Sequence, residues 1–176
     1  AVLAAVDACE AATRRCRAQI SEEGPGGCTP GGLCDALQEL AGSWAELRAA
    51  EQRARSGGAL AVRRVDLAVE ARANTVRPLF DALLDKAVEV HAGLLRRARA
   101  SAADVDSTVA ADEGVGLAVF AERLRSFLQQ EWVLDVLAAL GVDVPNHELF
   151  QASSGGAGPA AAAGREEAPA GAGAGG

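Results

Sequence analysis

The cysteines are the residues of this chain that could most readily bind a metal or form a covalent bond. The four lie close together in the first part of the chain, at Cys9, Cys16, Cys28 and Cys34. A structural zinc site usually takes close pairs of ligands from tight turns, whereas this spacing contains no CxxC and both histidines lie far along the chain. We therefore predict no metal site.

The same cysteines support two interpretations of redox chemistry. Cys16 and Cys34 each lie nine positions from Pro25, so a hairpin folded about that proline places them opposite one another and predicts a disulfide. A chain with this bond would be an oxidised lumenal or extracellular module. In a reducing compartment Cys9 and Cys16 are instead small buried residues of a helix seam.

No arrangement of residues typical of a catalytic site is recognisable. His91 lies near Glu89 and Asp85, but neither histidine follows a glutamate by three positions, as in di-iron bundles, and no HExxH is present. The single lysine, Lys86, follows Asp85 rather than a glycine-rich loop, which excludes a Walker A motif. There is no GxSxG, and the cysteines have no histidine close in sequence to act as a base. We predict a non-catalytic protein without a cofactor.

The elements that must position these residues are helices. Aromatic residues make up 3% of the chain and Tyr and Met are absent, which leaves Ala and Leu to form the core and favours helices over strands. In residues 1–22 small and apolar side chains alternate at spacings of four and three, a heptad seam on one helix face. The members of this first seam are Val2, Val6, Cys9, Thr13, Cys16 and Ile20.

The second predicted helix covers residues 33–55, after a loop rich in Gly and Pro at 24–32. Its seam keeps the same alternation and has one charged member: Leu33, Leu37, Leu40, Trp44, Leu47, Glu51 and Ala54. Ser56 and two following glycines end the helix. The first two helices therefore form an antiparallel hairpin.

A third predicted helix covers residues 59–100, with a stripe of valines and leucines between Val62 and Leu94. Pro78 interrupts it and either kinks one long helix or begins a second one, because proline removes a backbone donor and crowds the preceding turn. We favour a kink, with residues 74–77 as the weak point. Residues 101–116 give no clear prediction, since capping residues, Gly114 and Gly116 occur together there.

The last predicted helix covers residues 117–140 and ends at Gly141. Its first half carries one apolar stripe, and its second half is apolar almost all round. We predict an all-α fold, an up-down bundle of about four main helices, with residues 1–150 as the helical domain. Residues 151–176 are nearly all Gly, Ala, Ser and Pro, which predicts a disordered low-complexity tail.

The apolar end of the last helix is where we expect a partner to bind. A helix buried on one face in a bundle leaves the rest of an all-round apolar surface exposed, and an aromatic ring beside aliphatic side chains is typical of an interface hot spot. For Trp132 itself, burial in the chain's own core is the interpretation that we favour over exposure to a partner. The candidate interface consists of Trp132, Val133, Leu134, Val136, Leu137 and Leu140.

Charge and hydropathy narrow the class of partner. The net charge of −7 disfavours nucleic acid, whose phosphates require clustered basic residues, and the chain has no run of eighteen apolar residues that would predict a membrane span. We expect a scaffold or structural subunit that binds other protein subunits or itself, in the cytoplasm or within a large assembly. The alternative is a small-molecule-binding or enzymatic bundle with a core pocket, for which the polar seam residues are few: Thr13, Glu51 and Arg72.

Overall fold

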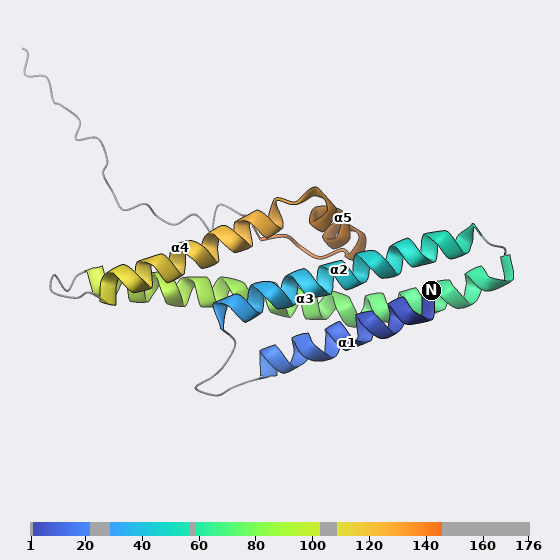
Figure 1. The fold of residues 1–176 in the computed structure, drawn as a ribbon, viewed down its shortest axis with the longest axis horizontal. Coiled ribbons are helices and arrows are strands. Elements are labelled where there is room, and N and C mark those ends of the chain that lie inside the picture. Colours follow the sequence, from blue (N-terminus) through green and yellow to red (C-terminus); the bar gives the residue numbers. More distant parts are fainter. Residues whose placement is uncertain (1, 22–28, 57–58, 103–108, 146–176) are drawn as a thin grey trace, which may run out of the picture.

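The computed structural model describes residues 2–21, 29–56, 59–102 and 109–145, and these residues form helices without a strand. The all-α prediction is confirmed. Five helices follow one another along the chain (Figure 1): α1 (Val2–Ser21), α2 (Pro30–Arg55), α3 (Ala59–Ala102), α4 (Val109–Leu128) and α5 (Glu131–Leu140).

Successive long helices run in opposite directions, which gives the bundle an elongated shape (Figure 1). α2 is the central element, because it packs against α1, α3, α4 and α5. α1 lies beside the first half of α3 and α4 beside its second half (Figure 1). Ion pairs also join the helices: Arg72 of α3 donates to Glu10 of α1 at 2.9 Å, and Arg123 of α4 donates to Asp35 of α2 at 2.7 Å.

The predicted seams form the core. The α1 seam buries Cys9, Thr13 and Cys16, and the α2 seam is buried from Leu33 through Glu51. The long stripe of α3 contributes buried valines and leucines to the core from Val69 onward. The four-three spacing places the apolar side chains on one face of each helix. The helices are stabilised when these faces pack against one another and are removed from water.

α2 begins at Pro30, three residues before the predicted start. The prediction placed Pro30 in the loop, but the first helical position is the one where a proline is favoured, since its missing N–H would have no partner there. Thr29 supplies the N-cap, and its hydroxyl oxygen accepts a hydrogen bond from the Gly32 N–H at 3.1 Å.

α3 is one helix that continues through Pro78 to Ala102. The interpretation in which the proline begins a second helix is therefore wrong, and the helix ends two residues beyond the predicted end near residue 100. Pro78 lies on the exposed side of the helix while the next two residues, Leu79 and Phe80, are buried. Packing of the buried face on both sides of Pro78 compensates for the lost backbone hydrogen bond.

The single helix predicted for residues 117–140 is wrong, because α4 ends at Leu128 and α5 begins at Glu131. Gln130 has an extended backbone at the N-cap of α5, with φ −73° and ψ 124°. The break turns α5 so that its buried side chains reach α2 as well as α4. α5 ends at Gly141, whose φ of 66° lies in the left-handed region that favours glycine.

The predicted disordered tail at 151–176 lies outside the described ranges, as do Cys28 and His147.

Candidate interaction surface

The structure divides the six residues of the predicted interface between core and surface. Val133, Val136, Leu137 and Leu140 are buried against the core, and Val133 and Leu137 are fully inaccessible. Trp132 and Leu134 are each 39% exposed. Only these last two side chains of the set are available to a partner, so α5 packs mainly within its own chain.

Trp132 lies in the first turn of α5 and its side chain is partly exposed. Its indole N–H donates to the Gln130 side-chain oxygen at 2.7 Å, across the turn that joins α4 to α5. This bond satisfies the polar atom of the ring. A partly exposed aromatic ring with a satisfied polar atom can bury its apolar face against a partner without losing a hydrogen bond.

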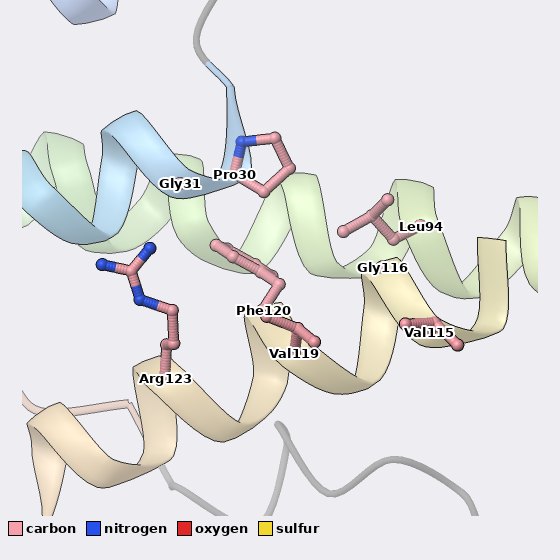
Figure 2. A pocket seen from close by; sticks show the side chains of 8 residues that line it. All are labelled: Pro30, Gly31, Leu94, Val115, Gly116, Val119, Phe120 and Arg123. Carbon is pink, nitrogen blue, oxygen red and sulfur yellow. The ribbon is translucent and has the colours of Figure 1, made fainter. Parts of the chain in front are cut away.

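A second apolar surface lies in a groove of about 370 Å³ between the beginning of α4, the end of α3 and the start of α2 (Figure 2). Val115 and Val119 are 60% and 55% exposed, one turn apart on α4. Leu94 of α3 and Pro30 of α2 line the groove opposite them (Figure 2). The aliphatic side chains therefore offer a partner an exposed surface of the kind found at interface cores.

The rest of the groove is closed from within the chain. Phe120 also lines the groove and is 2% exposed, so its ring belongs to the core. Arg123 is the one charged residue among the described residues of the lining, and its guanidinium is bound to Asp35. The open part of the groove is therefore apolar.

Two glycines accompany the exposed valines on α4. Gly116 lines the groove, and a Cβ added to it or to Gly114 would meet no other atom within 4 Å. Glycine inside a helix costs about 1 kcal/mol relative to alanine, and packing within the described part of the chain does not require it at either position. Small residues do allow the backbone of another helix to approach closely.

The groove was not predicted from the sequence, although the spacing of two of its valines indicates a second apolar face on α4. Val115 and Val119 are spaced four apart but fall outside the stripe that includes Leu117, Phe120 and Leu124. Two apolar residues that share a helix face away from the buried stripe indicate a second contact surface. Because no helix was predicted for residues 101–116, Val115 and Val119 were not recognised as residues of one helix face.

Three cysteines of the described ranges are buried: Cys9 and Cys16 of α1, where α1 packs on α2, and Cys34 of α2. Cys9 and Cys16 are inaccessible, and the Cys16 thiol donates to the Ala36 carbonyl oxygen at 3.4 Å. Burial, together with the negative charge of Glu39, raises the pKa of Cys16 to about 11, and burial also raises the pKa of Cys9. A protonated, buried thiol is a poor nucleophile and a poor metal ligand. The disulfide between Cys16 and Cys34 stays a prediction.

We expect the Cys16 thiol of the folded protein to react with iodoacetamide at least roughly a hundredfold more slowly than a cysteine in the unfolded chain, because the raised pKa leaves little thiolate and the site is closed. Mass spectrometry of labelled peptides gives both rates. Counting thiols in the denatured protein with and without reductant tests the disulfide: equal counts would contradict it.

His91 is a further buried residue with a titratable side chain. Its side chain lies in α3 with 6% exposure, and burial lowers its pKa from the ordinary value of 6.5. Glu89, the acidic residue beside it in sequence, is exposed and pairs with Lys86 at 2.8 Å. Glu89 is therefore engaged in a surface ion pair rather than placed as an acid-base partner.

Stability should decrease as the pH falls below about 6.5, because the unfolded chain takes up a proton at His91 before the folded chain does. Above that pH His91 is neutral in both states and contributes no slope. His91→Gln should remove the slope between about pH 6.5 and pH 5, whereas His147→Gln serves as the control. Denaturant titrations at several pH values measure the effect, and an unchanged slope in His91→Gln would show that another group titrates.

Each of the three polar seam residues, Thr13, Glu51 and Arg72, is bound by a neighbouring group. The Thr13 hydroxyl donates to the Cys9 carbonyl oxygen at 2.8 Å within α1. Glu51 is 3% exposed and bound by Arg48 and Arg55, and Arg72 pairs with Glu10. Each group is satisfied by its own neighbours, which is a structural use of buried polarity.

Within the described ranges, no group of three or more His, Cys, Asp or Glu residues could hold a metal ion. The helices of those ranges include none that is long and apolar enough to span a bilayer. Together the fold and the exposed groove define this part of the chain as a helical bundle with an apolar surface. Comparison with family models, curated proteins and solved structures gave no match to the chain.

Proposed function

We propose that this chain is a non-catalytic scaffold or structural subunit, an up-down bundle of about four main helices with a Gly/Ala-rich tail, that binds another protein within a larger assembly. The observation that carries the proposal is the groove of Figure 2, where Val115 and Val119 expose more than half of their side-chain surface. Scattered exposed apolar residues are common, but two on one helix face that also line a groove are typical of binding sites.

The occupant that fits this groove is an apolar helix of a partner subunit. A helix laid in a groove presents side chains at spacings of three and four, which matches the one-turn spacing of Val115 and Val119. The adjacent Gly116 adds no side chain to the wall, so a partner backbone can approach α4 there. Partner binding would remove the exposed apolar surface from water.

Tagged wild-type protein and the double variant Val115→Ser/Val119→Ser would be compared for co-purification from the native source. The partner is identified by mass spectrometry, and binding is then measured with both purified proteins. We expect the double variant to lose at least about tenfold in affinity while its melting temperature stays nearly unchanged, because both side chains are exposed in the isolated chain.

Leu67→Ser is the matched control, because Leu67 is 61% exposed on α3 but lies outside the groove lining. The control should retain the partner. Equal binding by wild type and the double variant would contradict the proposal. Concentration-dependent self-association of wild type that the double variant lacks would identify the occupant as a second copy of this chain.

A further inference from the structure

A second groove, of about 340 Å³, lies between the middle of α3 and the segment that follows α5. Leu84 is buried in its floor, while Val88 and Val144 are 37% and 41% exposed on its two sides. The described residues that line it are Asp81, Leu84, Asp85, Val88, Asp143, Val144 and Pro145. An exposed apolar pair is thus surrounded by acidic side chains.

Among the described residues that line this groove, none is basic. Asp81 and Asp85 lie one turn apart on α3, Asp143 faces the groove from the other side, and none of the three forms an ion pair within the described ranges. From Glu131 to Pro145 the chain adds two more carboxylates, those of Glu131 and Asp135, and no Lys or Arg. The local charge is therefore negative and uncompensated within the lining.

Arg77 and Lys86 are the cationic residues of α3 closest in sequence to Asp81 and Asp85. The Arg77 guanidinium carbon lies 3.7 Å from the position a Cβ would occupy on Gly141, at the C-terminal end of α5, where the helix dipole favours positive charge. Lys86 is bound to Glu89. Neither of these cations is among the groove residues.

We propose that this groove binds a basic amphipathic segment of a partner protein. Apolar side chains of that segment would pack on Val88 and Val144, and its Lys or Arg side chains would pair with the three aspartates. Lys and Arg suit such a site because their aliphatic stems cover apolar surface while their charged ends reach carboxylates. This chemistry differs from that of the groove in Figure 2, whose lining is apolar apart from one engaged arginine.

The sequence indicates that a partner supplies the basic groups, rather than the residues of this chain that follow Pro145. After Pro145 the next Lys or Arg is Arg165, and the intervening residues include Glu148. The residues that follow the groove directly therefore lack the Lys and Arg side chains that its carboxylates would attract.

The proposal can be tested with a fluorescein-labelled Leu/Lys peptide that carries leucines at helical spacings of three and four, compared with a Leu/Glu peptide of the same pattern. We expect fluorescence anisotropy to show binding of the first peptide to the full chain and not of the second. Raising the salt concentration should weaken the binding, because exposed charge pairs are screened.

Asp81→Asn/Asp85→Asn should weaken binding by about fivefold, as expected for two partly exposed charge pairs, and Val144→Ser should weaken it at low and high salt alike. Glu46→Gln/Glu70→Gln is the control, because it removes the same net charge from exposed residues that form no ion pair in the described ranges and lie outside the groove. Circular dichroism melting verifies that each variant folds, and Asp143→Asn gives a test outside any helix.

An equal loss of affinity in the control double variant would overturn the proposal, since binding would then depend on net charge alone. So would equal binding of the Leu/Glu peptide. Self-association of the wild type that is lost in Asp81→Asn/Asp85→Asn would assign the groove to a second copy of this chain and exclude a separate partner.

Discussion

Leu40→Ala should lower the free energy of unfolding by about 2–5 kcal/mol. Leu40 lies near the middle of α2 and is fully inaccessible. α2 packs against four other helices. The neighbouring side chains are therefore held in place and cannot move far enough to fill the space that the substitution leaves. The loss combines the apolar surface removed with the cavity that remains.

Denaturant unfolding followed by circular dichroism measures this difference, with the slope of the transition compared between variants. Gln38→Ala is the matched control, because Gln38 is an exposed residue two positions earlier on the same helix. We expect its effect to stay within about 0.5 kcal/mol. A similarly small effect of Leu40→Ala would contradict the assignment of the α2 seam to the core.

Val133→Asp should destabilise the chain by more than about 3 kcal/mol, because it places an unpaired carboxylate in a site without solvent access. Leu134→Asp, one residue further along α5, should change the free energy of unfolding by less than about 1 kcal/mol, since Leu134 is 39% exposed. The pair shares the helix and the introduced residue and differs in burial. Melting curves of the two variants measure the contrast.

If both α5 variants melted like the wild type, α5 would not be packed on α2 and α4 as the structure shows. In that case the whole apolar surface of α5 would be available to a partner, as the six-residue interface predicted from the sequence assumed. If both unfolded, Leu134 would be part of the core. The expected result lies between these two outcomes.

The seams could be predicted from the sequence because burial follows directly from spacing. Leu33, Leu37 and Leu40 repeat at four and three, and no other arrangement buries all of them on one face. Glu51 continues the same spacing, so the spacing predicts that it is buried but not which groups compensate its charge. Its two arginine partners became apparent once the helix placed them three positions before it and four after it.

The breaks between helices were harder to predict because they depend on tertiary packing. The residues around Gln130 contain no Gly or Pro to mark a turn, and the helix ends there because α5 buries a different face from α4. Pro30 was assigned to a loop by its type, whereas its position after a capping threonine places it in the first helical turn. Local signals were thus interpreted without the neighbouring elements that decide between alternatives.

The grooves lie beyond what a pattern along one helix can show. The groove of Figure 2 needs Leu94, Val119 and Pro30, which come from three helices. The acidic groove needs Asp81 and Asp143, which are brought together by the turn after α5. Helix periodicity reports which face is apolar, but the distance between faces of different helices depends on the fold.

The central claim, that this chain functions as a subunit, is tested most directly by measuring the mass of the particle that contains it. The untagged chain is purified from its native source without denaturant and analysed by size-exclusion chromatography with light scattering. The proposal predicts a particle well above the 17.8 kDa of the chain, containing a second protein in fixed ratio that Val115→Ser/Val119→Ser fails to retain. A particle of 17.8 kDa at the cellular concentration, with no co-purifying protein, would contradict it.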